Sequence, residues 1–431
     1  MAEYKKKHVK KGRKAIKNSV EEIDMKPKSR QKKVKDVPNN ETPKKQKTTP
    51  PPKIKVIRGN KNKIRKKRLI IFSAFLLVIC LIVGFALILP TGIFDFLGNK
   101  IALIGEGNGY PVSLSGGSIV DVVQSDSFYT VVSSTNMEGY NNNGKLVFSY
   151  QHGYERPCLE TSSTRMILFS QGQKEYAVYN FRKNLVTAST DNDILSAAVA
   201  DNGYYALATQ SDSYSSEVTV YNTKNELTFK WFCADYIIND VVFSPNGKNI
   251  AVSAFNASNG HFVSKLYILE FDSATPLKTF TFENDLLVSL STVSNKSFCA
   301  VFSNHTDFFA WKKYETTSFS GDKSVTFLRT SGSNNIVVTG REGNKSDNTI
   351  TVFNTKGEQK YSFDFGFEIV DITVIGKYIY ILSDKQIYLY NVKGDLLNTQ
   401  DCSFGITRIV PIKHHRVAAL TDTTVSKITI E

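Results

Sequence analysis

The chain carries two different hydrophobic patterns, one continuous and one alternating. Residues 69–89 are 21 consecutive positions without a charged side chain, and 16 of them are Leu, Ile, Val or Phe. This run predicts a transmembrane helix, because about 20 apolar residues are needed to cross the hydrocarbon core of a bilayer. A cleaved signal peptide fits less well, since 68 residues precede the run and the run is longer than the apolar region of a signal peptide.

Residues 110–431 instead alternate apolar and polar positions over short segments, which is the pattern of half-buried β-strands. One unit recurs, in which two strands are followed by a hairpin whose first arm ends in an aromatic residue and asparagine. Asparagine favours such turns because its side chain bonds the nearby backbone and tolerates the left-handed conformation. The aromatic-Asn pairs are Tyr140-Asn141, Tyr179-Asn180, Tyr221-Asn222, Phe353-Asn354 and Tyr390-Asn391.

The repeated unit predicts an all-β fold, an eight-bladed β-propeller. Each unit holds four short strands, and successive units start 37 to 49 residues apart. A period near 40 with four strands is typical of a propeller, whereas a β-sandwich keeps no such period. Seven blades is the alternative, because the unit around residues 287–321 matches the pattern least well. The first strands are expected to begin near Ile119, Pro157, Ile194, Ile238, Leu287, Val325, Ile369 and Ile406.

The two ends of the repeat region predict how the ring closes. The last unit supplies only three strands before the sequence ends, and a spare strand, Tyr110–Leu114, precedes the first unit. The ring closes if this N-terminal strand becomes the fourth strand of the last blade. Closure is favoured because it removes sheet edges that would otherwise pair with other chains.

Charge divides the chain into unlike parts. The whole sequence has 54 Lys+Arg and 40 Asp+Glu, but residues 1–68 alone hold 26 basic and 6 acidic residues. Basic residues flank transmembrane helices on the cytoplasmic side, so we expect a cell-membrane protein with a single span, a cytoplasmic N-terminus and an extracytoplasmic propeller. The basic residues directly before the apolar run are Arg65, Lys66, Lys67 and Arg68.

Residues 1–68 contain almost no aromatic residue beyond Tyr4 and are rich in Lys, Pro, Asn and Thr. A segment of this kind cannot bury enough apolar surface to fold, so we expect a disordered tail that contacts anionic lipid head groups. Nucleic-acid binding is not favoured, because the tail has no interleaved aromatic residues. The predicted organisation is a tail at 1–68, a transmembrane helix at 69–89, a linker at 90–109 and a propeller at 110–431.

Motifs for catalysis, metals and cofactors are missing from the sequence. It contains no C-x-x-C, H-E-x-x-H or G-x-S-x-G segment, so we expect no cofactor, no metal site and a binding protein rather than an enzyme. The exterior cysteines Cys158, Cys233, Cys299 and Cys402 fall in different units, and the sequence leaves their disulfide status open. Cys158 and Cys299 lie in strand patterns, where a buried free thiol is the commoner state.

Candidate contact residues lie on loops that a propeller gathers at one face. The connections from second to third strand and from fourth to first strand converge around the central channel. Aromatic and histidine side chains on such loops suit contacts with a partner. The predicted contact residues are Tyr154, Tyr214, Tyr236, His261 and Phe262.

Several segments carry a family resemblance beyond the repeat itself. They are the basic tail with its apolar run, Tyr110–Leu114, Ser196–Val199, Ser211–Val220 and Phe243–Lys248. The chain resembles bacterial single-pass envelope proteins with an extracytoplasmic propeller of unknown function. Its periodicity is also similar to the WD40-like and quinoprotein-like propellers, although regular Gly-His and Trp-Asp dipeptides are missing. The resemblance implies no activity.

Together these features favour a membrane-anchored binding or scaffolding module for an envelope protein or a cell-wall glycan. Two alternatives stay open. Propeller active sites assemble from distant loops, so a polysaccharide hydrolase or lyase is one, and a transmembrane sensor that acts through the basic tail is the other.

Overall fold

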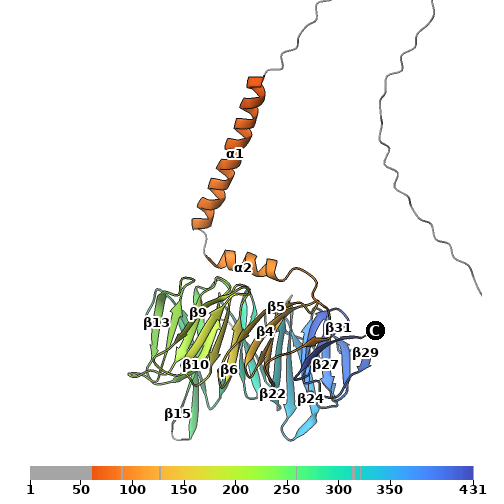
Figure 1. Ribbon diagram of the computed structural model, residues 1–431. Helices are drawn as coiled ribbons and strands as arrows, with labels where there is room; N and C mark the ends of the chain where they lie inside the picture. Colours follow the sequence, from red (N-terminus) through yellow and green to blue (C-terminus); the bar gives the residue numbers. More distant parts are fainter. Residues whose placement is uncertain are drawn as a thin grey trace, which may run out of the picture. The chain divides into compact units, whose positions relative to one another are not determined.

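Figure 1 shows the computed structural model of the chain. The chain divides into two compact units, Met1–Ala74 and Phe75–Glu431. The structure describes residues 61–88, 91–125, 128–258, 260–312, 316–320 and 322–430, without the side chains of residues 61–65, 81–93, 258 and 316–320.

Helix α1, Lys61–Ile88, covers most of the apolar run predicted to span the membrane. Within the part of the chain that the structure describes, no helix is long and apolar enough to cross a membrane. The transmembrane span therefore stays a prediction. Residues 1–60 of the predicted disordered tail lie outside the described residues.

In the described residues after α1, the regular elements are helix α2, Thr91–Ala102, and 32 strands. The strands of the first half are β1 Val112–Ser113, β2 Ile119–Ser125, β3 Phe128–Ser133, β4 Asn136–Asn141, β5 Leu146–Gln151, β6 Pro157–Thr161, β7 Met166–Ser170, β8 Glu175–Tyr179, β9 Asn184–Ser189, β10 Ile194–Val199, β11 Tyr205–Thr209, β12 Ser216–Tyr221, β13 Leu227–Cys233, β14 Ile237–Phe243, β15 Asn249–Ser258 and β16 His261–Glu270. Those of the second half are β17 Lys278–Glu283, β18 Leu287–Ser294, β19 Ser297–Phe302, β20 His305–Ala310, β21 Thr316–Ser320, β22 Ser324–Ser331, β23 Asn334–Arg341, β24 Asn344–Phe353, β25 Gln359–Phe365, β26 Asp371–Ile375, β27 Tyr378–Ser383, β28 Gln386–Asn391, β29 Leu396–Asp401, β30 Arg408–Lys413, β31 Arg416–Leu420 and β32 Thr424–Thr429.

The strands form eight antiparallel sheets of four, the blades of a propeller. Blades 1 to 7 are β2–β5, β6–β9, β10–β13, β14–β17, β18–β21, β22–β25 and β26–β29, and blade 8 is β30–β32 with β1. Strand β1 pairs with β32 through Val112 and Val425. The prediction of eight blades closed by an N-terminal strand is therefore confirmed. The blade that matched least well in sequence, β18–β21, is complete.

Burial explains why the strands of one blade differ in sequence. All five residues of the second strand β7 are buried, because neighbouring blades cover both of its faces. The outer strand β13 alternates exposed and buried positions, because only one of its faces packs on the core. Apolar side chains then join adjacent blades, as where Val218 of blade 3 and Val252 of blade 4 share one cluster.

The repeated asparagines close the turns between third and fourth strands. The Oδ1 of Asn354 accepts hydrogen bonds from the backbone N–H groups of Lys356 and Glu358, at 2.8 and 3.0 Å. Its Nδ2 donates to the carboxylate of Glu358 at 2.6 Å. Blades 3 and 7 repeat this arrangement with the pairs Asn222–Glu226 and Asn391–Asp395.

Blades 1 and 2 use the same asparagines differently, to hold helix α2. The Nδ2 of Asn141 donates to the carbonyls of Leu103 and Gly105, and the Nδ2 of Asn180 donates to Asp95 at 2.9 Å. Where blades 3, 6 and 7 have an acid four residues after the asparagine, blade 1 has Lys145 and blade 2 has Asn184. The helix lies within the predicted linker, and the sequence analysis did not foresee it.

The cysteines of the described residues are free thiols. Cys233 and Cys299 are buried, and Cys158 and Cys402 are half-buried. Burial raises the pKa of the Cys299 thiol above its usual range, with Asp307 as a smaller cause, which keeps it protonated. The disulfide question that the sequence left open is thus answered in favour of free cysteines.

Candidate functional site

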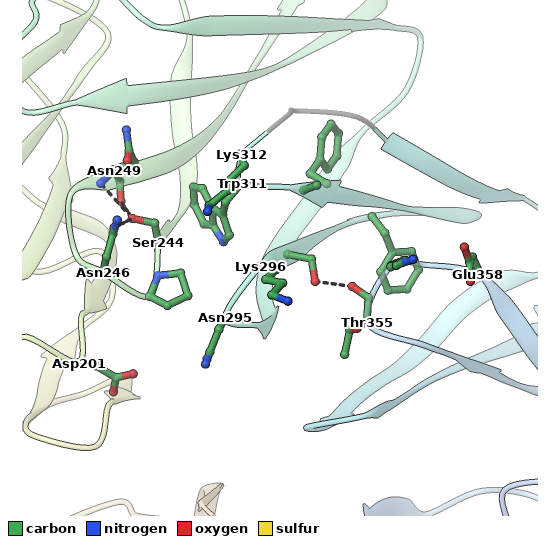
Figure 2. A pocket seen from close by; sticks show the side chains of 16 residues that line it. Asp201, Ser244, Asn246, Asn249, Asn295, Lys296, Trp311, Lys312, Thr355 and Glu358 are labelled. Carbon is green, nitrogen blue, oxygen red and sulfur yellow. Dashed lines mark hydrogen bonds between the residues drawn. The ribbon is translucent and has the colours of Figure 1, made fainter.

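A cavity of about 1150 Å³ opens on the propeller face formed by the turns between first and second and between third and fourth strands (Figure 2). Blades 3 to 6 contribute to its wall. The turn residues that surround it include Asp201, Ser244, Asn246, Asn295, Lys296, Trp311, Lys312, Thr355 and Glu358. It is the candidate site because it combines volume with amide, cationic, acidic and aromatic groups.

Hydrogen bonds fix the turns that form the cavity wall. Ser244 Oγ accepts from the backbone N–H of Asn249 at 3.0 Å and donates to Asn246 Oδ1 at 2.8 Å. Across the cavity, Ser297 Oγ donates to the carbonyl of Thr355 at 2.5 Å and thereby joins blade 5 to blade 6 (Figure 2). A ligand would therefore meet turns held in place before it arrives.

Trp311 supplies the aromatic part of this wall. Its ring packs against Phe298 with centroids 4.5 Å apart, and only 8% of the residue is exposed. Within the described part of the chain, its Nε1–H has no hydrogen-bond partner. The Nε1 atom is itself covered by neighbouring atoms, so a ligand in the cavity would contact the accessible edge of the ring and not this donor.

A smaller cavity of about 380 Å³ shares Asp201, Ser244 and Asn295 with the first and continues to Glu160 on the innermost strand of blade 2. By surface area Glu160 is exposed to this cavity, but the surrounding blades crowd its carboxyl and separate it from bulk water. This burial, with smaller contributions from Asp240 and Asp121, raises the pKa of Glu160 to about 8. Glu160 is therefore an acid that takes up a proton near neutral pH.

The neighbouring Asp240 has a structural task. Its carboxylate accepts hydrogen bonds from the backbone N–H of Leu290 at 2.7 Å and from Ser196 Oγ at 2.9 Å, which ties blade 4 to blades 5 and 3. Burial raises the pKa of Asp240 to about 6, and these hydrogen bonds oppose the rise. Its oxygens are thus committed to linking blades.

The five predicted contact residues all lie on the opposite face of the propeller. Tyr214, His261 and Phe262 are exposed, whereas Tyr154 and Tyr236 are half-buried. The five form no shared cluster among the described contacts, and four of them have separate local partners. Tyr214 packs on Phe232, Tyr154 packs on His152, the Tyr236 ring lies under Lys265 Nζ, and His261 bonds Asn284. Their role in binding stays a prediction.

The same face holds an acid–histidine cluster that the sequence analysis missed. His305 Nε2 lies 3.4 Å from Asp285 and 3.8 Å from Asp307, and its ring stacks on Phe302 at 4.1 Å. Burial raises the pKa of Asp285, and His305 opposes this. The available signal was the spacing of His305 and Asp307, which places both side chains on one face of β20.

Metal binding finds no support in the ranges that the structure describes, where no three His, Cys, Asp or Glu side chains are grouped to hold an ion. The sequence expectation of no metal and no cofactor is not tested further by this observation.

Two solved structures are similar to this chain. BamB from Moraxella catarrhalis is 12% identical and covers 74% of this chain and 98% of its own, with a TM-score of 0.49. The C-terminal WD40 domain of Sif2 is 12% identical and covers 74% of this chain and 97% of its own, with a TM-score of 0.53. At this identity the likeness to the WD40 domain shows the fold alone, a β-propeller.

A comparison with curated proteins gives no match. Residues 108–430, which are most of the chain, match the family of unknown function DUF5711. The match begins just before strand β1 and ends with the last described residue of the propeller. The chain therefore belongs to this family, and its propeller is the part that the family shares.

Proposed function

We propose that this protein is a single-pass, membrane-anchored propeller that binds an extended segment of another envelope protein in the large cavity. The apolar run of residues 69–89 with its basic flank supports the anchor. The cavity supports the binding role, since its amide, lysine and carboxylate groups match the donors and acceptors of a polypeptide backbone and its side chains.

The observation that carries the proposal is the preformed cavity itself, whose turns place amide, lysine and carboxylate groups around the packed ring of Trp311. In Figure 2 the Trp311 side chain stands between the blade 4 turn at Ser244 and the Lys296 side chain. The accessible edge of this ring would contact a bound segment, and the surrounding turn groups would supply its hydrogen bonds.

The test replaces Lys312 with a photo-crosslinking residue in the full chain expressed in cells. Lys312 is exposed at the cavity. We expect one reproducible protein adduct. Trp311→Phe should lower its yield about fivefold, because the smaller ring removes about 1 kcal/mol of apolar contact from the cavity wall. Trp231→Phe is the matched control, since Trp231 is equally buried but lies in the outer strand β13. An adduct with a glycan would instead favour binding of the cell wall. Equal yields for both variants would contradict a partner bound in the cavity.

A polysaccharide hydrolase is the second candidate, favoured by Glu160 alone. Glycoside hydrolysis uses one protonated and one ionised carboxyl group, and the raised pKa of Glu160 suits the acid. Against it, Asp240 is occupied by hydrogen bonds from blades 3 and 5. If the wild-type protein turns over none of a panel of polysaccharides, or if Glu160→Gln retains full turnover, this candidate fails.

A further inference from the structure

Helix α2 is amphipathic, but it packs its polar side on the propeller and exposes its apolar side. Its polar residues Asp95 and Asn99 are buried against the propeller together with Gly98. Among the side chains that the structure describes, from residue 94 on, its exposed side is apolar apart from Lys100. The apolar residues of that side, with their exposed fractions, are Phe94 44%, Phe96 36%, Leu97 52%, Ile101 69% and, two residues beyond the helix, Ile104 69%. A helix packed on a soluble protein normally buries its apolar face and exposes its polar one.

The polar side of α2 is fully engaged, so the apolar face cannot turn inward. Asp95 Oδ2 accepts from Arg165 Nε at 3.1 Å, and both side chains are nearly inaccessible. Asn99 Nδ2 donates to the carbonyl of Thr164 at 2.8 Å, and Asn99 Oδ1 accepts from the backbone N–H of Phe181 at 3.1 Å. Every one of these contacts requires the present orientation of the helix.

Lys145 fixes the other end of the helix. Its ammonium group donates to the carbonyl of Ile104 at 2.7 Å and to that of Ala102 at 3.2 Å, where the helix leaves carbonyl groups unpaired. The acid found at the corresponding turn position in blades 3, 6 and 7 could not make these bonds. The propeller therefore presents the apolar stripe as a fixed surface.

The chain itself indicates what covers this surface. Two residues separate the end of α1 at Ile88 from the start of α2 at Thr91. Three Cα–Cα steps reach at most about 11 Å, so a helix that leaves the bilayer at residue 89 keeps the start of α2 within the head-group region. Phenylalanine and leucine enter that boundary readily, and a lysine beside them reaches the phosphates. Lys100 Nζ lies 5.5 Å from the Phe96 ring, at the rim of the stripe.

We infer that α2 lies in the surface of the bilayer, with Phe94, Leu97 and Ile101 inserted among the lipids. This rests on the proposed membrane anchor. The helix then fixes the orientation of the propeller. The face that carries the cavity is the one that α2 packs on, so it turns toward the membrane. The hairpins β15–β16 and β23–β24, which project from the side away from α2 (Figure 1), turn outward.

The test measures the depth of α2 in the full chain reconstituted into phosphatidylcholine–phosphatidylglycerol vesicles whose acyl chains are brominated near the head group. Bromine quenches tryptophan on contact. We expect Leu97→Trp and Ile101→Trp each to add a tryptophan whose emission falls at least about twofold relative to unbrominated vesicles, because an interfacial helix buries its apolar face ~5–10 Å deep. Both positions are largely exposed, so the substitution disturbs no packing.

Phe404→Trp is the matched control, since Phe404 is 83% exposed on a loop of the opposite face. The native Trp231 and Trp311 are buried and give the background. One outcome separates the two proposals. If the chain resists carbonate extraction but the tryptophans at 97 and 101 are quenched no more than the one at 404, the membrane anchor is supported and the inference about α2 is wrong. Protection of α2 by a second copy of the chain, seen as cross-linked dimers without quenching, also overturns it. If carbonate extracts the chain from the vesicles, the proposed membrane anchor is wrong, and the inference about α2 that rests on it is wrong too.

Discussion

Single carboxyl groups decide much of how the blades hold together. Asp371 does in blade 7 what Asp240 does in blade 4, because it accepts from the backbone N–H of Ile409 in blade 8 at 2.9 Å and from Arg329 of blade 6 at 3.0 Å. Nothing in the sequence distinguishes these aspartates from solvated ones, since their partners are backbone groups of the next blade. Their role appears only when the ring closes.

Glu160 gives a prediction at the residue scale. Its pKa is raised in the fold to about 8 from an ordinary 4.5, so the folded protein binds the proton more tightly than the unfolded chain does. The stability that this contributes is complete below about pH 4.5 and is lost as the pH rises through 8. Glu160→Gln cannot ionise, so we expect it to lose less thermal stability than the wild type between pH 5 and pH 9, by a few degrees in the unfolding midpoint.

Thermal unfolding of the full chain at a series of pH values measures this. Glu342→Gln, in an exposed hairpin, is the control and should follow the wild type. A Glu160→Gln variant whose midpoint falls with pH as steeply as the wild type would contradict the pKa shift.

At the scale of elements, the repeated turn asparagine closes its own turn and also bonds a neighbouring group. Its Oδ1 always bonds the turn backbone, whereas its Nδ2 bonds whatever stands nearby. In blades 3, 6 and 7 that is an acid of the same turn, and in blades 1 and 2 it is helix α2 or its end. The sequence predicted the turns because they are local. It did not predict the helix contact, because the partner lies tens of residues away.

The clamp between Asp95 and Arg165 can be broken selectively. Asp95→Asn would leave the Arg165 guanidinium, 4% exposed, without its charged partner, which costs about 3–5 kcal/mol for a buried pair. We expect α2 to leave the propeller, seen as faster amide hydrogen exchange in residues 94–104. Arg182→Ala is the control, since Arg182 is half-exposed and 3.9 Å from Asp95, and exposed pairs contribute at most about 1 kcal/mol. Equal protection of α2 in both variants would show that the clamp does not hold the helix.

At the scale of the whole molecule, a short strand carries the closure of the ring. Strand β1 has two residues, and the pairing continues in one further hydrogen bond from Leu114 N–H to the carbonyl of Thr423 at 2.8 Å. Val112 and Leu114 pack into the cluster formed by blades 8 and 1. These half-buried side chains therefore support the closure together with the backbone pairing.

Val112→Asp tests this closure. It places a charge against the apolar cluster and should lower the free energy of unfolding by about 2–4 kcal/mol. Ser113→Asp changes the neighbouring, exposed position and should leave stability within about 0.5 kcal/mol of the wild type. Chemical unfolding gives the energies, and light scattering shows whether the freed edge of blade 8 causes association. Similar stability of the two variants would mean that β1 is dispensable for the closed ring.

The sequence by itself determined the architecture of the propeller. Alternation and turn asparagines are local signals. The alternation recurs in all eight blades and the turn asparagine in five of them, so weak patterns reinforce one another. Even the closure could be predicted, because a unit with three strands and a spare strand before the first unit leave one arrangement without open edges.

Only the tertiary structure decided which polar and aromatic side chains lie together on the propeller. The cavity wall draws Asp201, Ser244, Trp311 and Glu358 from four different blades, at sequence separations that no motif spans. The predicted contact residues were chosen from loops of one face, and the cavity lies on the other. Burial of Asp95 and exposure of Leu97 likewise follow from which propeller turns meet α2. Which side of a helix or ring is covered depends on contacts between distant segments, and sequence patterns report only the segments themselves.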